Sequence, residues 1–419
     1  MSFAIKFYSL LVRTLSILIL KFPSQNFKVK HWQKSQKSFS FSQIPPKNKR
    51  LRIWFHCASW GEFAKIQLLA EELTSDFEIF VTFFSVSGIL SLEDIRRTKP
   101  ESILGFQQNI ANLQKVNFLL LPPDTKSNSE KLISKILPSF VVWTESEIWL
   151  NYSLELEKRK IQQIVLCGKL KSKSFKLNPI VKPLFKQLYN QAKSISALDE
   201  NSAQNFAKLG VEKSKISTLD DLKIEKLLRL KKNSIPKVWQ ELKKEKKIFV
   251  FGSLHKSDWN IFKKAILELQ EKFYLILVPH EPKDLSFLQE IITNLKLSDS
   301  QILSKTKSLS KNLILIDRVG LLQQILSISD LAYIGGGFEP KGIHSILEAK
   351  IFQVPTFFGT NFQNSTEVLE EDEKFVVSTS EEFLEKIEKI GNSHPNYKIP
   401  QSNFKKIKNI ILEAAKLTS

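Results

Sequence analysis

Short apolar runs alternate along the chain with longer segments whose apolar residues recur at helical spacing. We interpret as buried strands the runs at 51–55, 77–84, 116–124, 140–143, 161–170 and from 194 in the first half, and those at 248–251, 273–279, 312–317, 331–334 and 356–358 in the second. This repeated strand–helix order predicts doubly wound parallel sheets. The lysine-rich segment 219–245 contains no strand-like run, so we expect a domain boundary there.

The first 22 residues are apolar but carry Lys6 and Arg13, and their uninterrupted part, 14–20, is shorter than the about 20 residues that span a bilayer. No small-residue cleavage site follows, which argues against a signal peptide. The segment could be an amphipathic helix lying in a membrane interface or a core helix, and we favour the interface. The polar residues 25–50 are expected to be a linker or an extended entry into the first domain.

The composition favours an anionic partner. Lysine and arginine number 62 against 43 aspartate and glutamate, a net charge of +19, and such an excess attracts polyanions. Because the lysines are scattered and form no arginine-rich arm, we expect an anionic membrane surface and no nucleic acid as partner. Cys57 and Cys167 predict reduced, buried thiols, and no metal-ligand spacing is visible along the chain, so we expect no metal and no cofactor.

The stretch 330–365 has the pattern of a nucleotide-binding loop. A buried strand leads into three glycines, 335–337, and a helix is predicted from Gly342. On that helix His344 and Glu348 would share a face, the first-turn N–H groups would bind a phosphate, and Glu348 would accept hydrogen bonds from ribose hydroxyls. The alternative is an ordinary glycine turn of a parallel α/β domain.

Carboxylates also follow predicted strands, at the edge where open α/β sheets bind ligands. Glu62 lies in the first turn after strand 51–55, where it could act in catalysis or simply complement the helix dipole. Glu145 and Glu147 follow strand 140–143, and both could face a ligand only if the chain turns there. The lysines that follow strand 161–170 could bind phosphates or lie in a solvated loop.

Five segments, taken in order, resemble the 3-deoxy-D-manno-octulosonic acid (Kdo) transferase family, which adds Kdo to lipid A precursors in lipopolysaccharide biosynthesis. They are HCASWGEF (56–63), WTESEIWLN (143–151), FGSLHKSDW (251–259), IGGGFEPKGIHSILEA (334–349) and GTNFQN (359–364). Their order and spacing agree from about residue 50 to residue 365. The segment PHEPKD (279–284) departs from the family pattern, because the arginines expected near the donor are missing.

The resemblance implies a GT-B glycosyltransferase fold, with two doubly wound Rossmann-like domains facing across a cleft and an N-terminal membrane-associated helix. It implies four regions: the membrane-associated helix 1–22, an acceptor-binding α/β domain 23–225, a nucleotide-sugar-binding α/β domain 226–400, and a C-terminal helix 401–419 that could pack back on the N-terminal domain.

The implied activity is inverting transfer of Kdo from CMP-Kdo to a lipid A precursor, at the cytoplasmic face of the inner membrane. Glu62 would be the catalytic base. The implied donor-binding residues are Gly252, Ser253, His255, His280, Gly336, Gly337, His344, Glu348, Asn361 and Asn364, and the implied acceptor-binding residues are Ser59, Gly61, Glu145, Glu147 and Lys169. Two alternatives stay open: a catalytically inactive membrane-bound scaffold that binds lipopolysaccharide precursors, and a GT-B enzyme that uses a different sugar nucleotide.

Overall fold

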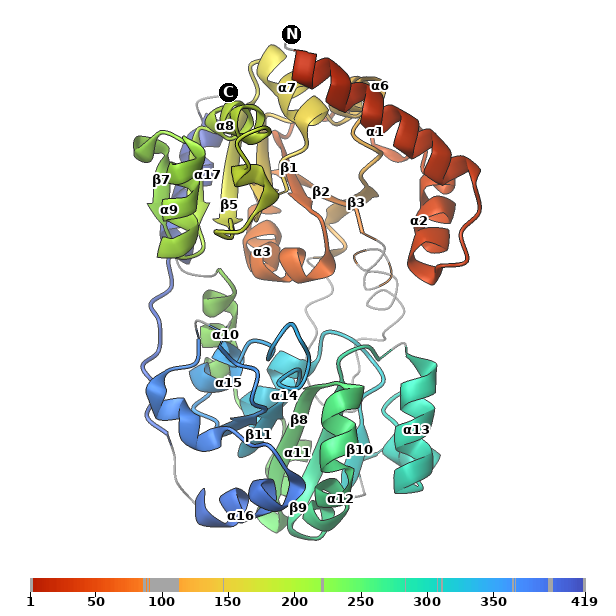
Figure 1. The fold of residues 1–419 in the computed structure, drawn as a ribbon, viewed down its shortest axis with the longest axis vertical. Coiled ribbons are helices and arrows are strands. Elements are labelled where there is room, and N and C mark those ends of the chain that lie inside the picture. Colours follow the sequence, from red (N-terminus) through yellow and green to blue (C-terminus); the bar gives the residue numbers. More distant parts are fainter. Residues whose placement is uncertain are drawn as a thin grey trace. The chain divides into compact units, whose positions relative to one another are not determined.

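The computed structural model describes residues 3–416 except 86–87, 89, 91–112, 146, 220–221, 283, 307, 310–311, 364, 366 and 391–394. The described residues form two compact units (Figure 1). One unit, called the N-terminal unit, comprises the residues up to 225 together with those from 400 onward, and the C-terminal unit comprises 226–399. The division falls inside helix α10 (Lys223–Lys232).

The N-terminal unit is built on a parallel sheet of seven strands in the order β3-β2-β1-β4-β5-β6-β7. The strands are β1 (Arg52–Cys57), β2 (Glu78–Phe83), β3 (Val116–Leu120), β4 (Phe140–Thr144), β5 (Gln162–Gly168), β6 (Ser194–Ala197) and β7 (Ile216–Thr218). The central strands are buried over their whole length, as their continuous apolar runs predict. Strand order reverses between β1 and β4, and ligands of open α/β sheets bind at such a point.

Helices cover both faces of this sheet, as the doubly wound prediction requires. They are α3 (Trp60–Leu73), α6 (Lys126–Ile136), α7 (Leu150–Lys158), α8 (Lys182–Asn190), α9 (Glu200–Leu209) and α17 (Phe404–Lys416). The last of these comes from the C-terminal end of the chain, yet Phe404, Ile407 and Ile411 lie in the same apolar cluster as β1. An ion pair between Lys408 and Glu72, 2.6 Å long, joins α17 to α3.

The prediction that 25–50 is a linker or an extended entry is wrong for much of that segment, because helix α2 (Phe27–Ser38) forms there. The polar composition of this segment gave no indication of the specific tertiary contacts that hold the helix in place. The Trp32 ring meets the Phe84 ring edge-on at 5.7 Å, and the Gln33 side chain donates to the carbonyl of Phe22, 2.7 Å away. Gln36 donates to the carbonyl of Leu121 at 2.9 Å, which ties α2 to the end of β3.

The N-terminal segment is helical as predicted and forms α1 (Phe3–Lys21). It is attached to its unit by polar contacts: the Tyr8 hydroxyl donates to Asp124 at 2.9 Å, and the Ser9 hydroxyl donates to Asn151 at 2.7 Å. Its large apolar side chains are 42–63% exposed at Phe7, Leu10, Leu11, Leu15, Ile17, Leu18 and Ile19. No helix in the described residues combines the length and the apolar character needed to cross a membrane.

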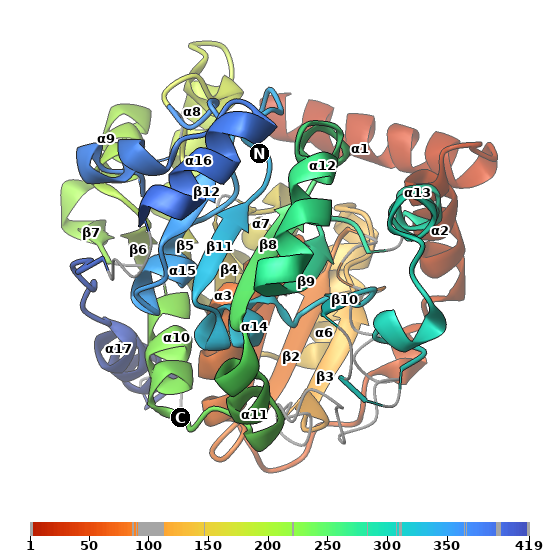
Figure 2. The ribbon, with the colours of Figure 1, turned by 90° about the horizontal axis from the view of Figure 1, so that it is seen from below.

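The C-terminal unit is built on a parallel five-stranded sheet in the order β10-β9-β8-β11-β12. Its strands are β8 (Lys247–Leu254), β9 (Phe273–Pro279), β10 (Leu313–Leu315), β11 (Leu331–Ile334) and β12 (Thr356–Phe358). Its helices are α11 (Lys237–Glu245), α12 (Lys256–Lys272), α13 (Leu285–Leu295), α14 (Leu322–Ile328), α15 (Leu347–Ile351) and α16 (Ser380–Ile390). Helices α12 and α16 lie side by side (Figure 2). Both units therefore confirm the predicted doubly wound parallel sheets.

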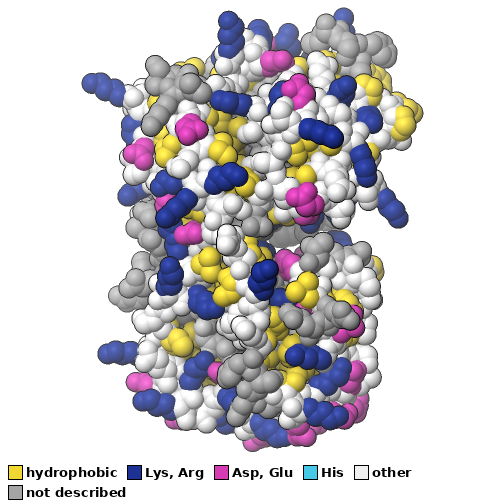
Figure 3. All heavy atoms as spheres, turned by 90° about the vertical axis from the view of Figure 1, so that its left-hand side faces the viewer, with side chains coloured by type: hydrophobic (Ala, Val, Ile, Leu, Met, Phe, Trp, Pro, Cys, Tyr) yellow, Lys and Arg dark blue, Asp and Glu magenta, His cyan; other side chains and the backbone are white. Residues whose placement is uncertain are grey.

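The basic side chains are dispersed. Figure 3 shows lysine and arginine side chains spread over the visible faces of both units, with aspartate and glutamate between them. On the face that the figure shows, the net charge of +19 is therefore not gathered into one patch.

Candidate active site

The carboxylate of Glu62 lies at the carboxyl edge of the N-terminal sheet, where strand order reverses. Ser59 is the N-cap of α3, and its hydroxyl accepts a hydrogen bond from the Glu62 N–H at 3.4 Å. The Glu62 side chain turns back toward the sheet, so that its Oε2 accepts from the Ala58 N–H at 2.8 Å and from the Thr144 hydroxyl at 2.7 Å. These contacts join the ends of β1 and β4 through one carboxylate.

Burial gives this carboxylate the properties of a base. Glu62 is 9% exposed. Burial raises its pKa to about 7; the hydrogen bonds from Thr144 and Ala58 oppose the rise, and the charges of Glu145 and Glu147 add to it. A carboxylate with a pKa near neutrality exchanges protons readily at physiological pH. Complementing the helix dipole alone does not require a buried carboxylate that faces the sheet edge.

The chain turns after β4, which is the condition stated above for Glu145 and Glu147 to face a common ligand. Glu145 adopts a positive φ of 51°, and its side chain forms an ion pair with Lys65 of α3. Burial raises the pKa of Glu147, and the charge of Lys176 opposes that rise. The two predicted acceptor residues therefore have different surroundings, and each has a lysine near it.

Lys176 is a functional candidate that sequence reasoning missed. The predicted Lys169 is exposed, whereas Lys176 lies half-buried in a short 3-10 helix, Phe175–Leu177. Its Nζ donates to the Tyr189 hydroxyl at 3.0 Å and lies over the Phe185 ring at 5.5 Å from the centroid. Burial lowers its pKa to about 8. Lys176 differs from the earlier lysines of this segment because it follows an aromatic residue, Phe175, and this difference could have marked it as a partly buried side chain.

Two motifs of the sequence meet at a buried histidine. Trp149 Nε1 donates to Nε2 of His56 at 2.9 Å, so the other ring nitrogen carries the proton and donates to the Thr82 hydroxyl, also at 2.9 Å. Burial lowers the pKa of His56 to about 3, so it stays neutral at physiological pH. His56 therefore holds the segment after β4 against β1, and its role is to position neighbours.

The helix predicted from Gly342 begins later than expected. Helix α15 starts at Leu347, and residues 342–346 are irregular. His344 and Glu348 therefore do not share a helix face, and that prediction is wrong. The N–H groups of Ile346 and Leu347 donate to Oε2 of Glu367 at 2.9 and 3.0 Å. A carboxylate occupies the helix end at which the sequence predicted a phosphate, which corrects that prediction too.

The glycines of this loop are explained by close packing of backbone on backbone. A Cβ on Gly337 would lie 2.4 Å from the Cα of Gly359, and a Cβ on Gly335 would lie 2.3 Å from the carbonyl oxygen of Ser253. Gly336 also has a φ of 93°, which L side chains rarely adopt. Approach of a ligand is therefore not needed to explain these three glycines.

Asp258 joins the loops after β8 and β11, and the sequence prediction gave it no role. Its Oδ2 accepts from the N–H groups of His255 at 2.9 Å and Gly336 at 3.0 Å, and its Oδ1 accepts from the Tyr333 hydroxyl at 2.7 Å. The side chain is fully buried, and that burial is the main cause that raises its pKa. An acidic residue three positions after the helix N-cap was the available signal.

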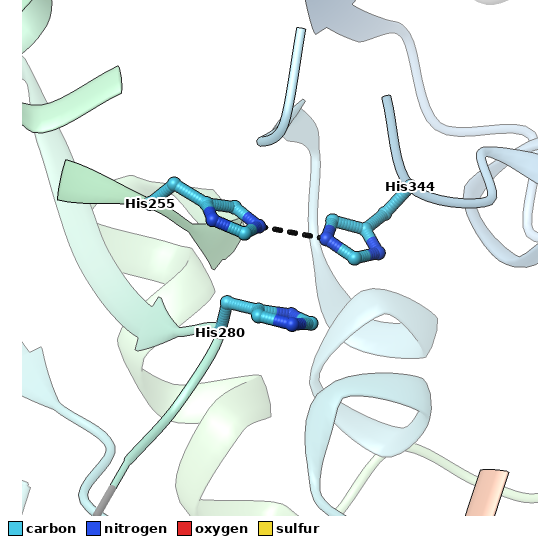
Figure 4. Close-up of side chains that lie close together, drawn as sticks. All are labelled: His255, His280 and His344. Atoms are coloured by element: carbon cyan, nitrogen blue, oxygen red, sulfur yellow. Dashed lines mark hydrogen bonds between the residues drawn. The ribbon is translucent and has the colours of Figure 1, made fainter. Parts of the chain in front are cut away.

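Three predicted donor-site histidines come together at the carboxyl edge of the C-terminal sheet (Figure 4). The Nε2 atoms of His255 and His344 lie 2.8 Å apart, and the His280 ring stacks 4.4 and 4.2 Å from their rings. Burial, the other two histidines and Lys341 lower the pKa of His344 to about 4. Spacing along the chain indicated no metal-ligand group, whereas the fold brings three histidines close enough together that they could hold a metal ion.

The remaining predicted residues lie at the same two sheet edges. Gly61 follows the N-cap of α3, and Gly252 and Ser253 lie near the end of β8, with Ser253 at a φ of 49°. The Asn361 N–H donates to the carbonyl of Gly337 at 2.8 Å. Glu348 accepts from Gln323 at 3.0 Å, and Asn364 lies outside the described residues.

Comparisons with known proteins identify similar sequences. Residues 30–226 match the family model described as 3-deoxy-D-manno-octulosonic-acid transferase (kdotransferase). A bifunctional glycosyltransferase/methyltransferase of Fusobacterium nucleatum is 25% identical over 97% of the chain, which spans 62% of that protein's length. A 3-deoxy-D-manno-octulosonic acid transferase of Chlamydophila psittaci is 26% identical over 76% of the chain and 71% of its own length.

Among solved structures, UDP-GlcNAc 2-epimerase from Methanocaldococcus jannaschii superposes with a TM-score of 0.54. At 20% identity, the match covers 88% of this chain and 99% of that one. The likeness supports a GT-B fold of two Rossmann-like units, and the sequence matches confirm the resemblance to the Kdo transferase family. The family model and the relative from Chlamydophila psittaci both carry names for the transfer of 3-deoxy-D-manno-octulosonic acid.

Proposed function

We propose that this relative of the Kdo transferases is an inverting glycosyltransferase that moves Kdo from CMP-Kdo to a lipid A precursor. The observation that carries the proposal is the carboxylate of Glu62, which is buried, held by two donors and has a pKa raised to about 7. It lies in the motif HCASWGEF, one of the five ordered segments that carry the resemblance to the family.

In the proposed reaction Glu62 deprotonates the acceptor hydroxyl. Both of the hydrogen bonds described above end on Oε2, so the proton would be taken up at Oε1. The acceptor oxygen then bonds to the anomeric carbon as the bond from that carbon to the phosphate oxygen of CMP breaks, and CMP leaves with the electron pair. A single displacement without a covalent intermediate inverts the anomeric configuration. A base with a pKa near the working pH is well matched to this step.

The C-terminal unit would hold the donor through its histidines. The N–H groups at the start of α15 already donate to Glu367, so we assign the donor phosphate to His255, His280 and His344, supported by Gly252 and Ser253. Histidine side chains donate hydrogen bonds to anions, and the charge of Lys341 reaches the same group. Glu348 would accept from the ribose hydroxyls, and Asn361 would help to line the site.

The N-terminal unit would receive the acceptor at a membrane surface. Helix α1 exposes a row of large apolar side chains and carries Lys6, Arg13 and Lys21, a combination typical of helices that lie in the membrane interface. A lipid A precursor is itself a phosphorylated amphiphile, and Lys176 lies half-buried beside Glu147 on the same unit. We therefore propose the cytoplasmic face of the inner membrane as the place of the reaction.

The test is release of CMP from CMP-Kdo in the presence of a tetra-acylated lipid A precursor. We expect acceptor-dependent release by the wild type and a loss of about 100-fold or more in Glu62→Gln, since general bases contribute about 10²–10⁴-fold. Glu71→Gln, on the same helix, is the matched control and should retain activity.

Other outcomes discriminate between the alternatives. If release survives in Glu62→Gln, the assignment of the base is wrong, and Glu147 becomes the next candidate because its pKa is also raised by burial. If the wild type binds the lipid but releases no CMP, an inactive scaffold replaces the transferase. Preferential binding of uridine over cytidine nucleotides would indicate a different sugar donor.

A further inference from the structure

The three clustered histidines come from three neighbouring strands. His255 directly follows β8, His280 directly follows β9, and His344 lies in the loop between β11 and α15. Because the sheet order is β9-β8-β11, the carboxyl ends of these strands are adjacent. One ring nitrogen from each histidine lies within 4.8 Å of one from each of the other two.

Backbone hydrogen bonds fix each of the three residues to this edge. The His255 N–H donates to Asp258 at 2.9 Å, the His280 N–H donates to the carbonyl of Leu254 at 3.0 Å, and the His344 N–H donates to the carbonyl of Gly335 at 3.1 Å. Metal sites need ligands whose backbones are held in this way by surrounding hydrogen bonds. The fold therefore fixes the backbones of all three histidines.

The ring geometry is close to that of a metal site. Two imidazole nitrogens on one tetrahedral Zn²⁺ lie about 3.3 Å apart, given Zn–N distances of about 2.0–2.1 Å. The Nε2 atoms of His255 and His344 are 2.8 Å apart, so a shared proton between them could be exchanged for a metal ion after a small opening. His280 stacks on both rings and brings a ring nitrogen within 4.8 Å of a nitrogen of each, so it is placed to supply the third ligand.

We propose that His255, His280 and His344 bind a divalent transition metal ion of the Zn²⁺ type. Imidazole nitrogens suit zinc, copper, nickel and cobalt, whereas magnesium and calcium prefer oxygen ligands. Three protein ligands leave a fourth position of a tetrahedral ion for an oxygen of water, phosphate or carboxylate. These are the histidines to which the proposed function assigns the donor phosphate. With a metal ion bound, that phosphate would meet the ion at its fourth position instead of the ring N–H groups.

The experiment uses the full chain, prepared without a polyhistidine tag and stripped of metal with a chelator. Titration with Co²⁺ is followed by the visible absorption of the tetrahedral ion, and Zn²⁺ affinity is measured by competition. We expect one equivalent of metal per chain. His280→Ala should lower the affinity by at least about 100-fold, because even partners outside the ligand shell contribute about 10–100-fold.

His31→Ala, in helix α2 of the other unit, is the control and should bind metal like the wild type. His280 is exposed, so its replacement should leave the thermal unfolding transition unchanged and the result interpretable even if variants of the other two histidines fail to fold. Absence of stoichiometric Co²⁺ and Zn²⁺ binding by the wild type would overturn the proposal. So would equal metal affinities of the wild type and His280→Ala. Neither readout requires donor, acceptor or turnover, so failure here leaves the transferase proposal untouched.

Discussion

Replacing Thr144 by valine removes one of the two hydrogen bonds that stabilise the ionised form of Glu62. The Thr144 hydroxyl donates to Oε2 of Glu62 at 2.7 Å, and valine keeps the branched shape of the side chain without the donor. The Ala58 N–H remains in place at 2.8 Å. Because the lost bond favours the charged carboxylate, the pKa of Glu62 should rise above its value of about 7.

The size of this rise follows from the energy of the bond. Hydrogen bonds to charged groups contribute about 1.5–3 kcal/mol, and one pKa unit corresponds to about 1.36 kcal/mol, which gives roughly one to two units. The Thr144 hydroxyl has a second acceptor, the carbonyl of His56 at 2.8 Å, and a single proton to share between them. We therefore expect the pKa of Glu62 to rise by about one unit, which is the lower end of this range.

The assay is the pH dependence of kcat/KM for CMP release. A base must be deprotonated to act, so the wild-type rate should rise with pH and level off above about 7. In Thr144→Val the rise of kcat/KM should shift to higher pH by about one unit, and the plateau value should stay similar. Thr144→Ser keeps the hydroxyl and should follow the wild type. If kcat/KM of Thr144→Val rises at the same pH as that of the wild type, Thr144 does not influence the pKa of the base.

Three further predictions follow from other contacts. The pKa of Glu62 is raised from 4.5 to about 7 in the folded state, so its protonated form is favoured by folding and the free energy of unfolding falls as pH rises through this range. Glu62→Gln should therefore be more stable than the wild type by up to about 3 kcal/mol at pH 8 and about equally stable below about pH 4.5, as measured by urea unfolding. Asp258→Ala leaves three donors, two of them buried, without their acceptor and should lower the stability of the C-terminal unit by at least about 3 kcal/mol, which the fluorescence of Trp239 and Trp259 would report; a smaller loss would mean that other groups or water take over. Leu10→Gln should weaken sedimentation with anionic vesicles about tenfold while thermal stability stays unchanged, because this side chain is 63% exposed on α1; equal vesicle binding would argue against an interfacial α1.

The strands were predictable because each buried strand corresponds to a continuous apolar run in the sequence. Strands such as β1 and β9 are buried along their whole length, so one segment of sequence identifies them. Helix α2 was not predictable in this way. Its mean hydropathy is low. It is held by single contacts, of Trp32 with the distant Phe84 and of Gln33 with the carbonyls of Ile19 and Phe22 at and just after the end of α1.

Site residues were predictable where they lie close together in the sequence, within a single motif. Glu62 and Ser59 lie within a few residues of each other, and their positions follow from one strand–helix junction. The histidine cluster depends on the order of strands in the sheet, which no local pattern states. The start of α15 depends on Glu367, which is twenty residues after Leu347, the first residue of the helix it caps.

The origin of α17 has a consequence for how the protein is made. This helix supplies Phe404, Ile407 and Ile411 to the core of the N-terminal unit, yet it is synthesised after every residue of the C-terminal unit. Domains usually fold as units in the order in which they leave the ribosome. Here the N-terminal unit lacks part of its apolar core until α17 has been translated, and all residues of the C-terminal unit have been made before that point. A nascent chain that stalls before residue 400 would carry an unfilled apolar surface on its first unit, and such a product would be a substrate for chaperones and proteases.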